Sequence, residues 1–175
     1  NRRFKTKLSC SIFNSNSNYI FHFAFHTFMK ILIHLIIFFS SFIIMEGVAW
    51  FSHKYIMHGL LWFLHKDHHQ TTKVKLKKND LFFLFYAIPS ILLIGVGAKY
   101  SIDWMLYSGL GIMAYGFVYF IFHEVFIHKR LNWFKNSSSK YLRAMRKAHL
   151  SHHKQSSKTG YSCFGMLVFP KKHYK

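Results

Sequence analysis

Three stretches of the chain are long and apolar enough to cross a lipid bilayer: residues 31–50, 81–98 and 104–122. A helix needs about 20 apolar residues for this, and only helices and closed barrels satisfy every backbone polar group in lipid. The composition agrees, because 51% of the 175 residues are hydrophobic and 20% are aromatic. The sequence therefore predicts a single all-α integral membrane protein with three, or at most four, transmembrane helices.

The charges predict how these helices are oriented. Only residues 99–103 separate the second and third stretches, so we expect a tight helical hairpin. Three spans then place residues 51–80 and 123–175 on one side of the membrane, and most of the Lys and Arg behind the net charge of +19 fall in these two segments. Basic loops favour the cytoplasmic side, so we expect these two segments to form a cytoplasmic, histidine-rich helical cap. No nucleic-acid-binding motif accompanies the charge, so we expect no nucleic-acid partner.

The first 28 residues do not fit this topology. They begin without Met, are rich in Asn and Ser, and place four basic residues on the outer side. We therefore expect residues 1–28 to be a non-native extension or a disordered tail, with translation from Met29 and a membrane domain over 29–175. His22, His26 and His34 are expected to be incidental or lipid-facing. Cys10 and Cys163 form no CxxC pair and are expected to be free thiols.

Ten of the fourteen histidines form two copies of one pattern, HX4H followed by HXXHH, each beside an apolar stretch. Imidazole is a good ligand for iron, zinc, copper and nickel. Ten rings supply enough nitrogen for two such ions with positions left open for chemistry. The candidate metal ligands are His53, His58, His65, His68, His69, His123, His128, His149, His152 and His153.

The two spacings make different geometric demands. Positions i, i+3 and i+4 of an α-helix share one face, so the three histidines of each HXXHH should point the same way. Positions i and i+5 lie about 140° apart on a regular helix. The HX4H pairs therefore need either a local π-type widening or a break, for which Gly59 is a suitable place.

Only five acidic residues are present, and they fit neither of two common metal sites. They are Glu46, Asp67, Asp80, Asp103 and Glu124. The Glu-x-x-His motif of ferritin-like di-iron sites and the HExxH motif of zinc hydrolases are both missing. Asp67, Asp80 and Glu124 are candidates to accept the free ring N–H of a ligating histidine. Each could equally be a solvated or salt-bridged surface acid.

Further residues carry a resemblance to a known family. HKYIMHG (53–59), the HXXHH at His65, Asn79-Asp80, SILLI (90–94), AYG (114–116), Arg130, Tyr141-Leu142, FGML (164–167) and Pro170 accompany the histidines. Together they resemble the fatty acid hydroxylase and sterol desaturase superfamily, most closely its bacterial β-carotene 3-hydroxylases. HX4H alone is a weak signal that is shared across the superfamily, whereas HKYIMHG with the spacing of both boxes is a strong signal for this branch. The departures are mild: Lys66-Asp67 inside the first HXXHH, and Glu124 where Asp is expected.

The resemblance implies a non-haem di-iron monooxygenase of the bacterial inner membrane, with its site facing the cytoplasm. Two irons held by the ten histidines would use O2 and electrons from a reduced ferredoxin to hydroxylate C3 of the β-ionone ring. β-Carotene would pass through β-cryptoxanthin to zeaxanthin. No catalytic residue beyond the metal ligands is implied, and the substrate-binding residues are not identified.

Other functions stay open at this point. The same boxes would serve a hydroxylase or desaturase of another membrane lipid, such as a fatty acyl chain or a sterol, or ketolation at C4 of the same ring. A non-enzymatic metal-binding or transport protein is a further alternative. Its ligands would be expected near the bilayer midplane, whereas these histidines follow the ends of the spans.

Overall fold

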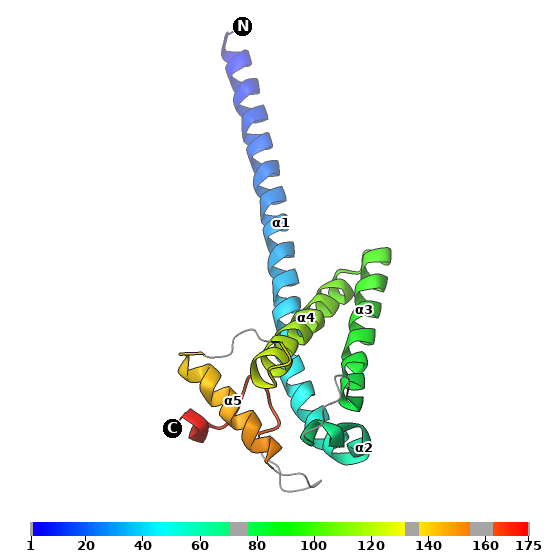
Figure 1. Cartoon of the computed structure of the whole chain (residues 1–175). Coiled ribbons are helices and arrows are strands. Elements are labelled where there is room, and N and C mark those ends of the chain that lie inside the picture. The colour runs from blue at the N-terminus through cyan, green and yellow to red at the C-terminus, as the bar shows by residue number, and fades with distance from the viewer. Residues whose placement is uncertain (1, 71–76, 132–136, 155–162, 175) are drawn as a thin grey trace.

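The architecture is taken from a computed structural model that describes residues 2–70, 77–131, 137–154 and 163–174, with side chains from residue 19 onward. The chain begins with one long helix, α1 (Arg2–Phe51), which continues into a π-helix, η1 (Ser52–Leu60). Three short helices follow: α2 (Trp62–His65), η2 (Lys66–His69) and η3 (Lys78–Leu81). Helices α3 (Phe82–Tyr100) and α4 (Asp103–Phe120) form a hairpin, and α4 packs against the second half of α1 (Figure 1).

The remaining elements lie at the end of the bundle away from the hairpin turn (Figure 1). Helix α4 continues into a second π-helix, η4 (Ile121–Ile127), and the chain ends with α5 (Lys140–His153) and η5 (Lys171–Tyr174). Helix α5 is amphipathic, and its buried face includes Ala144, Met145 and Ala148. It packs against η4 around Phe126, Ile127 and Met166.

The three predicted membrane spans are confirmed. Within the described ranges, three helical segments are long and apolar enough to cross a membrane: Tyr19–Leu60, Lys78–Tyr100 and Asp103–Ile127. They contain the three predicted stretches, and the predicted hairpin turns within two residues, where Ser101 adopts the left-handed conformation (φ 56°). The protein is an all-α integral membrane protein.

Small residues let the three spans approach closely. A side chain at Gly111 of α4 would overlap the carbonyl oxygen of Phe38 in α1. On the other side of α4, Ser90 Oγ donates to the Gly109 carbonyl oxygen at 2.9 Å. Close backbone contact and interhelical hydrogen bonds replace hydrophobic driving force in lipid. This packing fixes the ends of α1 and α4, from which the two HX4H pairs extend.

Outside the ten motif histidines, the N-terminal helix gives mixed outcomes. His22 and His26 are exposed, as expected. His34 is not incidental: its Nε2 lies 3.0 Å from Asp103 Oδ2 and its ring stacks on Tyr107 at 4.1 Å. It joins α1 to the start of α4. Helix α1 extends back to Arg2, and the expectation that the domain begins at Met29 stays a prediction.

Candidate metal centre

Two π-helices solve the spacing problem of the HX4H pairs. Just after η4 the His128 N–H donates to the His123 carbonyl oxygen at 3.0 Å, and just after η1 the Leu61 N–H donates to the Ile56 carbonyl oxygen at 2.8 Å. These are i→i+5 bonds, which bring positions five apart to nearly the same face. The ring centroids lie 5.1 Å apart for His53–His58 and 4.6 Å apart for His123–His128. Both predicted devices occur, because Gly59 also leaves helical geometry (φ −102°, ψ −106°).

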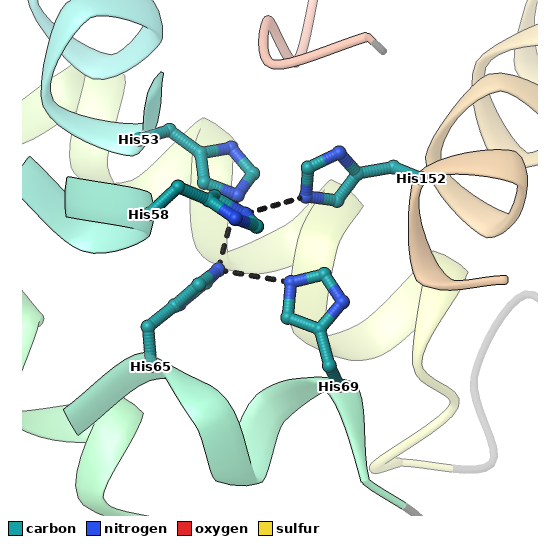
Figure 2. Close-up of side chains that lie close together, drawn as sticks. All are labelled: His53, His58, His65, His69 and His152. Atoms are coloured by element: carbon teal, nitrogen blue, oxygen red, sulfur yellow. Dashed lines mark hydrogen bonds between the residues drawn. The ribbon is translucent and has the colours of Figure 1, made fainter. Parts of the chain in front are cut away.

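The first cluster gathers five imidazoles from three parts of the chain (Figure 2). Each offers a nitrogen within 4.8 Å of all the others: His53, His58, His65, His69 and His152. The Nε2 atom of His65 lies 3.2 Å from Nε2 of both His53 and His69. Nε2 of His58 lies 3.0 Å from Nε2 of His152, which comes from α5. The Nε2 atoms therefore converge on one small volume.

The second cluster lies next to the first. Four nitrogens within 4.8 Å of one another come from His68, His128, His149 and His153. Nε2 of His149 is 3.1 Å from Nε2 of His128 and 2.8 Å from Nε2 of His153. His123 stands at the edge of this group, with its ring centroid 4.6 Å from His128 and 4.7 Å from His149.

The two HXXHH boxes exchange one histidine each. His65 and His69 join the first cluster but His68 joins the second, while His149 and His153 join the second but His152 joins the first. The expectation that all three histidines of a box point the same way is therefore wrong. Positions i+3 and i+4 of an α-helix differ by about 100° around the axis, so a helix lying between two clusters presents one residue to each. In the first box, the change from α2 to the 3-10 turn η2 separates His68 further.

The hydrogen bonds fix lone pairs that face each other. His53 Nδ1 donates to the Phe164 carbonyl oxygen at 3.0 Å, and His65 Nδ1 donates to Asn79 Oδ1 at 2.6 Å. With Nδ1 protonated, a neutral imidazole carries a lone pair on Nε2. These two Nε2 atoms are 3.2 Å apart, and two acceptors cannot hydrogen-bond to each other. A cation between them would satisfy both.

Burial keeps the rings unprotonated. Burial is the main cause that lowers the pKa of His65 to about 4 and the pKa of His128 to about 3. Burial also lowers the pKa of His68, whose Nε2 is buried and has no hydrogen-bond partner among the described residues. At neutral pH these rings are neutral nitrogen donors. An all-imidazole set of this kind fits a transition-metal ion such as iron, zinc, copper or nickel.

Comparison with known proteins identifies the family. The profile of the fatty acid hydroxylase family matches residues 38–169, which include all ten motif histidines. The chain belongs to the fatty acid hydroxylase family. No solved structure matches it.

Several curated relatives carry a more specific name. The chain is 37% identical over 105 residues to the beta-carotene hydroxylase of Pantoea ananas, covering 59% of this chain and 58% of that protein. It is 35% identical over 140 residues to the beta-carotene hydroxylase of Pseudescherichia vulneris, covering 78% and 77%. A chloroplastic beta-carotene hydroxylase 2 of Capsicum annuum is 33% identical over 109 residues, covering 61% and 35%. The matched region thus covers less than two thirds of the length of the Pantoea ananas protein.

In this fatty acid hydroxylase domain, one of the three candidate acids contacts a motif histidine. Glu124 Oε1 lies 2.6 Å from His123 Nδ1, and its other oxygen accepts from Arg130 Nε at 2.8 Å. Asp80 also accepts from Arg130, at 2.8 and 3.1 Å, and so supports Glu124 indirectly. Asp67 accepts instead from the backbone N–H groups of Lys78 and Asn79. It therefore shapes η3.

Four residues near the clusters were not singled out by the sequence analysis as site residues. Asn79 orients His65, and the Phe164 carbonyl orients His53. The Trp62 ring lies 5.2 Å from His58, and Tyr119 stacks on His123 at 4.9 Å. Asn79 and Phe164 belong to the motifs that carry the family resemblance, but neither residue type indicates metal chemistry. Phe164 is 111 residues from His53, so no local pattern connects them.

Proposed function

We propose that this protein is a non-haem di-iron monooxygenase that hydroxylates C3 of the β-ionone ring, converting β-carotene through β-cryptoxanthin to zeaxanthin. The observation that carries the proposal is the pair of adjacent imidazole clusters whose Nε2 atoms converge at the ends of the spans. Membership of the fatty acid hydroxylase family supports a hydroxylase, and the names of the bacterial and plant relatives support β-carotene as substrate.

The ten histidines divide between two proposed ion sites. One iron would be held by the first cluster and the other by the four histidines of the second cluster together with His123. Bound iron would supply, with O2 and external electrons, the oxidising power that an unactivated C–H bond requires. The protein side chains supply the neutral donors, fix their orientation through Asn79, Glu124 and the Phe164 carbonyl, and keep the site buried. Such hydrogen-bond partners commonly tune a bound metal.

Aromatic residues shield the first cluster from water. The Phe164 ring centroid lies 5.2 to 5.6 Å from those of His53, His58 and His152, and Trp62 lies 5.5 Å from His69. These walls and the position at the span ends suit a hydrocarbon substrate that is dissolved in the bilayer. The outward faces of α1 and α3 carry exposed Phe, Ile and Leu, consistent with lipid around the spans.

The electron donor is proposed to be an acidic ferredoxin-type protein on the cytoplasmic side. The histidine end carries Lys54, Lys66, Lys77, Lys78 and the basic residues of α5, whereas the hairpin turn carries Lys99 and Asp103. This asymmetry favours a cytoplasmic histidine end, here the cytoplasmic face of the bacterial inner membrane. The exposed basic residues of α5 lie on the opposite side of that helix from its buried histidines.

Pigment analysis tests the proposed reaction. Bacteria that accumulate β-carotene and contain a reduced ferredoxin would express the chain, and their carotenoids would be separated by liquid chromatography. We expect β-cryptoxanthin and zeaxanthin with the native chain and only β-carotene with His68→Ala. Unchanged β-carotene, with the native protein verified in the membrane and iron bound, would contradict the substrate and favour another lipid. Readily exchanged metal without O2-dependent turnover would favour a transport role instead.

A further inference from the structure

Glu46 is a carboxylate within a membrane-spanning segment. It belongs to the Tyr19–Leu60 span, with its side chain directed to the interior of the molecule. Placing an acid there is costly, so an intramembrane ionisable residue usually marks a function. The comparisons and the metal chemistry leave Glu46 without a role.

The two oxygens of Glu46 accept four hydrogen bonds from two distant parts of the chain. Oε1 accepts from the backbone N–H groups of Met166, Leu167 and Val168 at 2.9, 2.8 and 3.0 Å. Oε2 accepts from the hydroxyl of Tyr115 in α4 at 2.7 Å. A carboxylate that receives three consecutive backbone donors holds the turn around them, because hydrogen bonds to a charged acceptor are stronger than neutral ones.

The turn that Glu46 holds also contacts the first cluster. Glu46 and His53 are seven residues apart, about two helical turns, so they lie near the same face of the continuous α1–η1 helix. His53 Nδ1 donates to the carbonyl oxygen of Phe164, two residues before Met166. Residues 164–168 are therefore attached to one helix at two points, and the Phe164 ring lies against His53, His58 and His152.

Gly165 makes this attachment possible. A Cβ at this position would lie 2.5 Å from the carbonyl oxygen of Val168 and 3.1 Å from Glu46 Oε1. Any side chain would therefore push the turn away from the carboxylate. Cys163, two residues before Gly165, adopts a left-handed conformation (φ 65°) and leads the chain into the turn.

We infer that Glu46 is a positioning residue. It holds residues 164–168 against the α1–η1 helix, so that the Phe164 carbonyl fixes the ring of His53 and the Phe164 side chain covers the first cluster. This inference rests on the proposed function only in taking the first cluster as a metal site. It separates Glu46 from the acids of the second cluster, because its effect passes through the C-terminal turn to His53.

Two measurements on the full-length protein test the inference. The first is the rate at which Cys163 is alkylated in a Cys10→Ser background, which reports whether the turn stays attached. The second is the affinity of each cluster for Co²⁺, a spectroscopic probe, with His65→Ala and His149→Ala identifying the signals of the first and second clusters. The variants are Glu46→Ala, Glu46→Gln and Gly165→Ala. Gly47→Ala is the matched control, since it adds a methyl group beside Glu46 in open space.

We expect Glu46→Ala and Gly165→Ala to speed alkylation on the order of tenfold, which corresponds to the loss of about one net hydrogen bond. Both should weaken Co²⁺ binding at the first cluster by about 10–100-fold, as for other partners of metal ligands, and leave the second cluster unchanged. Glu46→Gln keeps an accepting oxygen, so it should retain most of the native behaviour. Gly47→Ala should match the native chain.

Native alkylation and Co²⁺ binding in Glu46→Ala and Gly165→Ala would overturn the inference. So would equal weakening of both clusters, because that result would indicate general damage to the fold. A native chain that binds Co²⁺ at both clusters but forms no hydroxylated carotenoid would contradict the proposed reaction alone, and the comparison of variants would still decide the role of Glu46.

Discussion

At the scale of single residues, the main finding is that neighbours in sequence serve different clusters. His68 follows His65 by three positions, yet its ring centroid lies 4.5 Å from His153 and 4.6 Å from His128, in the second cluster. His152 lies between two second-cluster residues in sequence but contacts His53 and His58. The exchange is reciprocal. It ties the two proposed ion sites together, because neither sequence block completes a cluster alone.

The exchange predicts which substitutions share a phenotype. His152→Ala should weaken metal binding at the same site as His65→Ala, and His68→Ala at the same site as His149→Ala. Each variant loses a direct metal ligand, so the affinity of its site should fall by at least about tenfold. Titration of the four purified variants with Co²⁺, followed by absorption spectroscopy, would sort them into pairs. A pairing of His68 with His65 and of His152 with His149 would show that the clusters follow the sequence blocks, contrary to the structure.

At the scale of elements, the apolar pattern allowed the three spans and the hairpin to be predicted, because lipid permits few backbone conformations. The five-residue spacing of the HX4H pairs required a departure from the α-helix, and the structure contains both a π-helix and a break at Gly59. The exchange of His68 and His152 could not be predicted, since it depends on where α5 lies relative to η2. The same holds for Asn79 and Phe164, whose contacts span 14 and 111 residues.

The π-helix η1 gives a prediction at this scale. Deletion of Tyr55 would shorten the His53–His58 spacing from five residues to four and restore the i→i+4 pattern of an α-helix. Both histidines would remain, but their positions relative to His65 would change. We expect hydroxylation to fall by at least about 100-fold, with metal lost from the first cluster, because misplacement by about 1 Å can cost that much.

Tyr55→Ala is the control for this deletion, because Tyr55 is 49% exposed and its ring contacts Trp50, Phe51 and Lys54 of the same continuous helix. It should retain activity within about threefold, as expected for a substitution away from the site. Product formation and metal content per chain would be measured for both variants. Native metal content in the deletion variant would show that the five-residue spacing is not required.

At the scale of the whole molecule, the basic residues and the histidine clusters lie at the same end. Both clusters lie at the end of the bundle opposite the α3–α4 turn, together with the basic segments that give the chain most of its charge of +19. Helix α5 combines the two properties, since His149 and His152 are buried on one face while Lys140, Arg143 and Lys147 are exposed on the other. A helix is about 10–12 Å across with its side chains. An acidic protein bound to the basic face would therefore lie close to the clusters.

Electron delivery should accordingly depend on salt and on the charge of α5. Opposite charges raise association rates, and the effect weakens as the Debye length falls from about 30 Å at 0.01 M salt to about 8 Å at 0.15 M. Lys140→Glu combined with Arg143→Glu should slow reduction by a ferredoxin about tenfold at low salt and much less at high salt. The fold should tolerate the change, because the first turn of α5 contains no acid and acidic residues stabilise a helix N-terminus.

Lys99→Glu, at the hairpin turn, is the matched control and should leave the rate of reduction unchanged. The measurement is stopped-flow reduction of the iron-loaded protein in detergent over a range of salt concentrations. Equal slowing by Lys99→Glu, or a rate independent of salt, would place the donor elsewhere and leave the basic face of α5 to interact with lipid headgroups.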